Sequence, residues 1–196
     1  MAVAFQFDFE SALAAIVYLT SKKPDTFDKY RLGKLIFLAD KSHLVRYARP
    51  ITGDAFCAME WGPVPSTTLH LLNALLGENF EDARVRKLGE FLFIDRRYEY
   101  PRFTAKNEIK FDNFLSRSDI EILEEILKLH GKKSFDELKA LTHEMPAYKN
   151  AWGSGEVKNA PMRFEDFFEE DGDAIRGVRE EMIENDELRK TFGTRV

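Results

Sequence analysis

The sequence is poor in cysteine and has no long apolar run. Cys57 is the only cysteine in 196 residues, and one thiol can form neither an internal disulfide nor a zinc cluster. No apolar stretch approaches the about 20 residues that span a bilayer. The opening residues, MAVAFQFDFE, lack the basic segment that begins a secretory signal. These absences favour a cytoplasmic protein that does not enter the membrane.

A basic excess is also missing. The formal net charge is −5, and residues 161–196 account for it with eleven acidic and six basic side chains. The rest of the chain is balanced, and its 23 cationic side chains match 23 anionic ones. Proteins that bind a phosphate backbone usually carry a cationic surface. The totals therefore argue against nucleic acid as the main partner, although they leave room for a local basic patch.

The motifs of common catalytic sites are absent too. The sequence contains no GxSxG, no Walker loop and no GxGxxG. His143-Glu144 lacks the second histidine of a HExxH zinc site, and Cys57 has no cationic sequence neighbour that would activate it. Asp40 and His43 stand three residues apart, so they could form a proton-relay pair on one helix face. The simpler interpretation is an ordinary helix histidine, and we predict no catalytic residue, metal or cofactor.

The residues that are present predict a mainly helical protein. A first helix should carry Asp8 as its N-cap and run through Ser11–Thr20. A second, capped by Asp25 or Thr26, should run to about Tyr47 and include Phe27 in its apolar stripe. It is apolar around most of its circumference, which is typical of a central helix. A third should start near Pro65 or Ser66 and end at Gly77.

A short β element is expected between the helices. Phe91–Ile94 and Tyr98–Tyr100 look like the two strands of a hairpin, with Pro101 confining the second strand to an edge. Ala55–Glu60 could add a third strand. Two capping boxes, Ser118–Glu121 and Ser134–Glu137, then open further helices. The predicted fold class is mainly α (α+β): a helical bundle-like domain with a small antiparallel β-hairpin or sheet.

The domain organisation follows from a change in composition. Residues 1–152 should form the main domain, and 153–161 (GSGEVKNAP) are the best linker candidate. Residues 162–196 are expected to be an acidic C-terminal helical extension. Its apolar side chains stand at helical spacing: Phe164, Phe167, Phe168, Ile175, Val178 and Met182.

Two aromatic segments have alternative interpretations. Trp61 opens a corner, Trp61–Pro65, that two prolines stiffen. Its ring could plug the core where strand meets helix, or it could flank a rigid edge that a partner grips. Near the N-terminus, Phe5, Phe7 and Phe9 alternate along the chain. This segment could pack back on the helices or add as a strand to the sheet of a partner.

Residues 34–72 resemble the SocA-like antitoxin family, whose shared module is the Panacea domain. The family pattern has a helix of the type KL(L/I)(Y/F)(L/Y)A, a histidine-leucine pair, a G(K/R)P(I/L) turn, a strand, and (W/H)GPV.P before another helix. The matching segments are Lys34–Ala39, His43-Leu44, Arg49–Ile51 and Trp61–Pro65. Ala48 departs from the pattern, because members often have glycine there. We expect the resemblance to cover about residues 10–145.

The resemblance implies a mostly helical domain with a small β element. It also implies an antitoxin of a bacterial or prophage two-gene toxin–antitoxin module that binds its cognate protein toxin directly and is not an enzyme. It supplies no catalytic residues, and it leaves the identity of the toxin and the oligomeric state open. The sequence suggests a set of toxin-contacting residues: Phe5, Phe7, Trp61, Pro63, Phe167, Phe168, Glu180, Glu181 and Glu184.

Several alternatives stay open at this stage. The acidic segment 161–196 could cover a basic toxin active site electrostatically, or it could dock on its own domain and show a charged face to water. The chain could be an adaptor that delivers the toxin to a protease instead of an inhibitor. Less favoured alternatives are a hydrolase built on Asp40 and His43, and a transcriptional autoregulator that uses a local basic patch.

Overall fold

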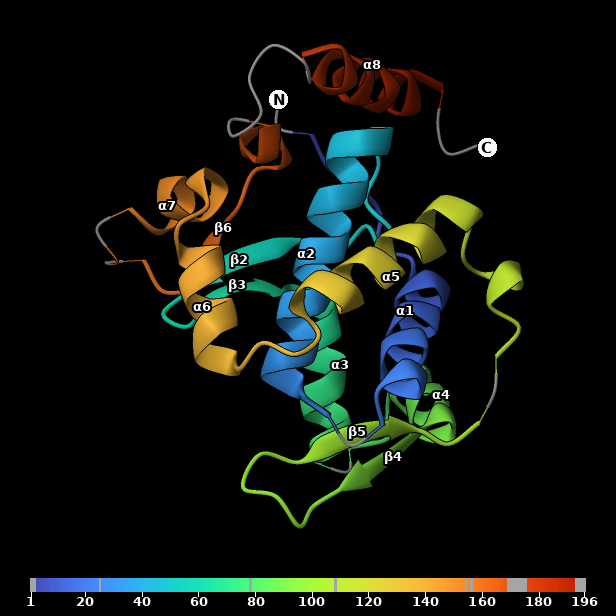
Figure 1. Ribbon diagram of the computed structural model, residues 1–196. Helices are drawn as coiled ribbons and strands as arrows, with labels where there is room; N and C mark the ends of the chain where they lie inside the picture. Colours follow the sequence, from blue (N-terminus) through green and yellow to red (C-terminus); the bar gives the residue numbers. More distant parts are fainter. Residues whose placement is uncertain are drawn as a thin grey trace.

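The computed structural model describes residues 3–24, 26–77, 79–107, 109–153, 155, 157–168 and 176–192. Helices and strands alternate along it in an irregular order (Figure 1). The helices are α1 (Phe9–Lys22), α2 (Lys29–Tyr47), α3 (Ser66–Leu76), α4 (Ala83–Phe91), α5 (Arg117–His130), α6 (Phe135–His143), α7 (Pro146–Trp152) and α8 (Arg176–Phe192), with 3-10 turns η1 (Phe111–Asn113) and η2 (Phe164–Phe168). The strands are β1 (Phe27–Asp28), β2 (Phe56–Met59), β3 (Gly62–Pro65), β4 (Leu92–Asp95), β5 (Arg102–Ala105) and β6 (Ala160–Pro161). The predicted mainly α, α+β class is confirmed.

Helix α2 is the centre of the molecule. It contacts α1, α3, α5, α6, α8 and strand β3, and Figure 1 shows these elements gathered around it. Leu35, Ile36 and Phe37 are almost completely buried although they are consecutive, so they point to different sides of the helix. The prediction of a central helix is therefore confirmed.

The two ends of α2 differ from the prediction in informative ways. Phe27 belongs to β1, so the helix starts later and Asp28 is its N-cap, accepting hydrogen bonds from the backbone N–H groups of Tyr30 and Arg31. Of the predicted caps, Asp25 lies outside the described residues, and the Thr26 hydroxyl instead donates to the carbonyl of Pro24. At the other end Ala48 has φ 57°. This left-handed conformation favours glycine, which explains why the family pattern has glycine at the position that Ala48 occupies in this chain.

Several other helix limits were predicted from local signals. Asp8 caps α1, α3 begins at Ser66 with Gly77 as its C-cap, and Ser134 with Glu137 forms a capping box on α6, all as expected. The cap of α5 was wrong by two positions, because Ser116 and Asp119 form the box there in place of Ser118 and Glu121. The short helices α4 and α7 were not predicted.

The first sheet contains β1, β5 and β4 in that order. The predicted hairpin is partly wrong, because the second strand follows Pro101 and does not include Tyr98–Tyr100. The carboxylate of Asp95 accepts hydrogen bonds from the backbone and side chain of Arg97, which ends β4 and opens a loop. Pro101 precedes β5, so its missing N–H costs no ladder bond. Strand β5 can therefore lie in the centre of the sheet, where an edge was expected.

The second sheet holds the Trp61–Pro65 corner. Its order is β3-β2-β6, so the predicted strand near Ala55–Glu60 exists but belongs to a different sheet from β4 and β5. Met59 pairs with Gly62, and Glu60 and Trp61 form the tight turn between β2 and β3. The corner is therefore the turn and second strand of a hairpin that leads directly into α3.

The segment after α7 is joined to the rest of the protein. Ala160 pairs with Ala58 in the second sheet, inside the stretch expected as a linker. Phe164 and Phe167 of η2 are buried in the common core. The division into 1–152, 153–161 and 162–196 stays a prediction, while α8 rests on α2 and η2 at one end of the molecule (Figure 1).

Candidate functional site

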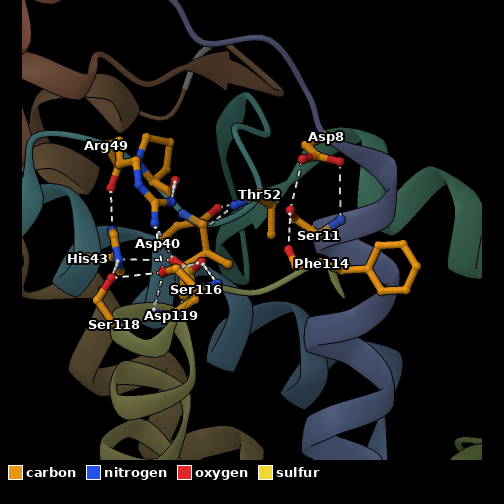
Figure 2. A network of polar contacts seen from close by, with 12 residues as sticks. Asp8, Ser11, Asp40, His43, Arg49, Thr52, Phe114, Ser116, Ser118 and Asp119 are labelled. Atoms are coloured by element: carbon orange, nitrogen blue, oxygen red, sulfur yellow. Dashed lines mark hydrogen bonds and ion pairs between the residues drawn. The ribbon is translucent and has the colours of Figure 1, made fainter. Parts of the chain in front are cut away.

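Two polar regions share helix α2. The first, which we call the joint, consists of Asp40, His43, Arg49, Thr52, Ser116, Ser118 and Asp119. The Ser116 hydroxyl is bonded to Asp119, and the Ser118 hydroxyl lies against His43. Figure 2 shows these side chains turned toward one another between α2, the loop after it and the start of α5. The second is a pocket beside the Trp61 corner. We compare the two because both contain residues of the family pattern.

Asp40 holds the loop that follows α2. Its carboxylate accepts hydrogen bonds from the backbone N–H groups of Ile51 at 2.8 Å and Thr52 at 2.9 Å, and from the hydroxyl of Thr52 at 2.5 Å. Burial raises the pKa of Asp40 to about 7, although these hydrogen bonds pull it down. The Asp40 carboxylate therefore supplies the hydrogen-bond acceptor that these buried backbone N–H groups of the turn need.

His43 connects the same loop to α5. Its Nδ1 donates to the carbonyl of Arg49 at 2.7 Å, while Nε2 lies 3.0 Å from both the Ser118 hydroxyl and Oδ1 of Asp119. The partners of His43 differ from those of Asp40, so the two do not form the relay pair that was the less favoured alternative. His43 is 0% and Asp40 1% exposed, so both side chains are buried within the joint.

The carboxylate of Asp119 has a partner on each of its two oxygens. Nη2 of Arg49 lies 3.0 Å from Oδ1 of Asp119, and Ser116 donates to Oδ2 at 2.8 Å. Burial alone would raise the pKa of Asp119, but the hydrogen bonds from His43 and Ser116 and the charge of Arg49 lower it. Buried polar networks of this kind are stable when each group has a partner. The joint is therefore built to fasten α5 and the loop to α2.

The joint also reaches α1. The backbone N–H of Asp8 donates to the carbonyl of Thr52 at 2.8 Å, and Ser11 donates to the carbonyl of Phe114 at 3.0 Å. Figure 2 shows this second group of bonds beside the first. Three helices and two loops are thus tied together where the histidine-leucine and Arg-Pro parts of the family pattern lie. This arrangement gives the histidine and the arginine of the family pattern a structural role, which is to hold these elements together.

The second region is a pocket of about 240 Å³, which we call the Lys34 pocket. Its walls come from α2, the β2–β3 hairpin and α3, and its lining residues are Lys29, Tyr30, Gly33, Lys34, Met59, Glu60, Trp61, Val64, Pro65 and Leu69. Lys34 is only 2% exposed, and its Nζ donates to the carbonyl of Pro63 at 2.7 Å. Burial, together with the nearby charge of Lys139, lowers the pKa of Lys34 to about 7.

Gly62 lets the hairpin approach this lysine. Its φ of 95° is accessible mainly to glycine. A Cβ at this position would also lie 2.9 Å from Nζ of Lys34, 3.0 Å from the Thr142 hydroxyl and 3.1 Å from Cδ2 of His143. Nε2 of His143 is buried and has no hydrogen-bond partner among the described residues. Burial lowers the pKa of His143, as do the charges of Lys139 and Lys34.

Tyr30 and Trp61, which line the Lys34 pocket, belong to a cluster of aromatic rings. The ring of Tyr30 lies 5.4 Å from Trp61, 5.9 Å from Tyr100 and 5.8 Å from Phe135, measured between centroids. We call these four side chains the aromatic corner. Trp61 is 44% and Tyr100 51% exposed, so the Trp61 ring is a surface group held by neighbours and not a plug in the core. Edge-to-face contacts of this kind hold rings in fixed orientations.

The remaining predicted contact residues divide by burial. The N-terminal segment packs back on the domain: Phe5 and Phe7 are half-buried, and the ring of Phe5 lies 4.9 Å from that of Phe164. Pro63 is buried in β3. Phe167 and Phe168 are 1% and 6% exposed. These five side chains lie mainly within the protein in this structure.

Helix α8 presents the acidic candidates. Glu180, Glu181 and Glu184 are exposed, whereas Met182 is completely buried and anchors the helix. The guanidinium of Arg189 lies 4.8 Å from the centre of the Phe5 ring. The helix thus docks on its own domain and shows a charged face to water. Ile175, which was expected in its apolar stripe, lies outside the described residues.

Two further searches cover the described part of the chain only. It contains no group of three or more histidine, cysteine, aspartate or glutamate side chains placed to hold a metal ion. None of its helices is both long and apolar enough to cross a membrane.

Comparison with known proteins gives one decisive match. The family model described as "Antitoxin SocA-like, Panacea domain" matches residues 32–149, which is more than half of the chain. The chain belongs to this family. The family name indicates an antitoxin-like role, and the matched range includes the joint and most of the Lys34 pocket. No curated protein and no solved structure matches the chain.

Sequence reasoning found Trp61 but missed its surroundings. Tyr30, Tyr100 and Phe135 come from α2, the β4–β5 loop and α6, and no local pattern places them together. Lys34 did leave a signal. It is a charged residue within LGKLIFLA, in a helix expected to be buried all round, and a lysine in that setting must be paired or perturbed.

Proposed function

We propose that the chain is an antitoxin that neutralises a cognate protein toxin by direct binding, with the aromatic corner as the centre of its contact surface. Membership of the antitoxin family supports the role. The observation that supports the surface is that Trp61 and Tyr100 are about half exposed yet held by Tyr30 and Phe135. Binding energy at interfaces concentrates on tryptophan and tyrosine side chains of this kind.

Rigidity is the second argument for this surface. Trp61 lies in a two-residue turn, and the hairpin strands on both sides are paired through Met59 and Gly62. The hydroxyl of Tyr148 donates to the carbonyl of Met59 at 2.8 Å and fixes the turn from behind. A side chain that is already ordered loses little entropy on binding, so more of its contact energy appears as affinity.

The test is to co-express the chain with the product of the adjacent gene and to measure complex formation. Trp61→Ala should weaken binding by about 2 kcal/mol or more, roughly thirtyfold in Kd, and abolish growth rescue. Phe93→Ala is the matched control, because Phe93 is 55% exposed and lines a broad hollow of about 660 Å³ elsewhere. Loss of binding in Phe93→Ala, with Trp61→Ala unaffected, would place the surface at that hollow instead.

Helix α8 is a second part of the proposed surface. Its exposed carboxylates, Glu180, Glu181 and Glu184, would favour a basic toxin by electrostatic attraction. Removing residues 161–196 would also remove core side chains such as Phe167, so a charge change is the cleaner test. Replacing the three glutamates by glutamine should lower the association rate and its salt dependence while leaving unfolding unchanged. An unchanged rate at low salt would remove α8 from the surface.

Neutralisation by binding and delivery to a protease predict different toxin levels. Direct inhibition leaves the toxin present but inactive in cells that contain the antitoxin. An adaptor would make the toxin disappear, and deletion of the host protease would restore it. Quantitative immunoblotting of the toxin, with and without the chain, separates the two.

A further inference from the structure

We propose that the Lys34 pocket binds the C-terminal residue of the partner chain, with the terminal carboxylate at Nζ of Lys34 and an apolar terminal side chain between the pocket walls. This inference rests on the proposed function, because it specifies which part of the toxin enters the aromatic corner. Three observations support it: a buried cation with few hydrogen-bond partners, apolar pocket walls and a small pocket volume.

The cation is Lys34. An ammonium group has three N–H donors, and the carbonyl of Pro63 is the acceptor found for it among the described residues. The nearby side chains of α6 add no negative charge: Lys139 is cationic, His143 is neutral or cationic, and the Thr142 hydroxyl donates to the carbonyl of Leu138. A buried charge with so few partners is costly, and a bound anion would relieve the cost.

The other charges that line the pocket are balanced. They are Lys29 and Glu60, and Nζ of Lys29 already donates to the side chain of Asn73 at 2.7 Å. Tyr30 and Trp61 add no charge to the lining. These residues therefore do not decide the sign of the ligand, and the buried Lys34 does.

The walls explain why we assign a chain end. Half of the lining is apolar and comes from Gly33, Met59, Val64, Pro65 and Leu69. An internal glutamate would offer these walls only two methylene groups. A C-terminal apolar residue carries its carboxylate and its side chain on one Cα, so it can satisfy the cation and the walls together. Capture of a terminal carboxylate is a known mode of peptide recognition.

The volume sets the size of the ligand. At about 240 Å³ the pocket is below the range of roughly 300–1,000 Å³ that is typical of sites for drug-sized molecules. One residue fits this space better than a nucleotide or another large cofactor. The rest of the partner would then run outward over the aromatic corner.

Short peptides test the assignment on the full-length protein. The probe is acetyl-Gly-Ser-Gly-Leu with a free carboxylate, and its controls are the same peptide with a terminal amide and an amidated peptide with an internal glutamate. Binding is followed by the fluorescence of Trp61, using Trp61→Phe to subtract the signal of Trp152, and by calorimetry. We expect the free acid to bind at least tenfold more tightly than either control.

Two variants and the pH dependence sharpen the result. Lys34→Met should remove the preference for the free acid over the amide. For the wild-type protein, Kd of the free acid should rise by up to about thirtyfold from pH 6.0 to 8.5, because Lys34 loses its proton in this range. The titratable groups facing it are Lys139, His143, Lys29 and Glu60, and binding of the amide, which has no charge to lose, supplies the baseline for their effects.

A second variant keeps the test valid if Lys34→Met does not fold. A Cβ at Gly33 would lie 3.6 Å from Cδ of Pro65, an ordinary contact, so Gly33→Leu should fold and place its side chain in the pocket. It should weaken the free acid at least tenfold. Equal binding of acid and amide by the wild-type protein would overturn the proposal, and so would tighter binding of the internal glutamate peptide.

Experiments with the toxin separate this inference from the proposed function. Extending the C-terminus of the co-expressed toxin by Gly-Ser-Gly-Ser should weaken the complex at least tenfold. If the extended toxin binds as tightly as the original, the inference is wrong while the antitoxin function stands. If no toxin binds but the peptides still discriminate acid from amide, the pocket assignment stands and the proposed function is wrong.

Discussion

The joint and the Lys34 pocket are made from the same helix, yet their buried ionisable groups differ in how many hydrogen-bond partners they have. In the joint, Asp40 has three hydrogen-bond donors around it, and Asp119 has partners in His43, Arg49 and Ser116. In the pocket, Lys34 has one carbonyl as its acceptor and shares the lining with Tyr30 and Trp61.

Within one family pattern, this difference distinguishes residues that hold the fold together from residues that we propose to bind a ligand. A polar group that is buried with all its partners stabilises one conformation and offers nothing to a ligand. A polar group that is buried with too few partners costs stability, and proteins usually retain such a cost at sites that bind something. The comparison assigns the joint to folding and the pocket to recognition, and the following four changes test it in order of expected effect.

The largest effect should come from the joint. Asp40→Ala leaves two backbone N–H groups and the Thr52 hydroxyl without their acceptor, so we expect a loss of about 3–5 kcal/mol in the free energy of unfolding. Urea titration followed by circular dichroism measures it. Asp40→Asn is the control, because its amide oxygen can still accept from the backbone, and it should cost less than half as much. Equal midpoints for Asp40→Ala and the wild type would contradict the structural role.

The second effect, in the Lys34 pocket, should be a dependence of protein stability on pH. The pKa of Lys34 falls from 10.5 in the unfolded chain to about 7 in the folded protein, so the unfolded state binds more protons between these values. Stability should therefore rise as pH increases from 7 to 10, and the penalty is fully present below pH 7. Lys34→Met should flatten the rise and, below pH 7, be more stable than the wild type by about 2–4 kcal/mol. A wild-type slope that survives in Lys34→Met would place the titrating group elsewhere.

A smaller gain should come from the pocket wall. Gly33 is inside α2, where glycine costs about 0.5–1 kcal/mol relative to alanine, and a Cβ there meets Pro65 at an ordinary distance. Gly33→Ala should raise the free energy of unfolding by up to that amount, measured by thermal or urea denaturation. The matched control is Gly62→Ala, which should destabilise because of its positive φ and its contact with Lys34. A destabilised Gly33→Ala would mean that the pocket is tighter than the structure shows.

The smallest effect on folding should come from the aromatic corner. Trp61 is 44% exposed, so Trp61→Ala should change the free energy of unfolding by less than about 1 kcal/mol. The same substitution should weaken toxin binding by roughly thirtyfold or more, and this contrast distinguishes a contact residue from a core residue. Phe37→Ala in the core supplies the other extreme, at about 3–5 kcal/mol. A loss for Trp61→Ala as large as that for Phe37→Ala would return the tryptophan to a structural role.

Sequence signals predicted the structure correctly where the deciding contact is between residues close together in the chain. Asp8 and Ser134 mark helix starts by accepting hydrogen bonds from backbone N–H groups two or three positions further on, and both were predicted. Phe27 was misassigned because its strand exists only by pairing with Phe103, far along the chain. The β4–β5 loop was misjudged because the side chain of Asp95 sets where the turn begins.

The candidate site shows the same limit. Trp61 was found from its own turn, but its ring contacts with Tyr30 and Phe135 require the hairpin to meet α2 and α6. The apolar segment around Lys34 predicted burial, while the missing acceptors became visible only in three dimensions. Sequence proximity made Asp40 the only partner considered for His43, whereas the carboxylate beside it in the structure, Asp119, comes from α5.

Strand β6 completes the sheet that carries Trp61 late in synthesis. Ala160 pairs with Ala58, about a hundred residues earlier in the chain. At about 5–20 residues per second, a ribosome needs roughly 5–20 s to add the segment between them. Nascent chains that stop short of β6 lack one strand of this sheet. The order of synthesis thereby sets a minimum time before the sheet beside Trp61 can be complete in each new molecule.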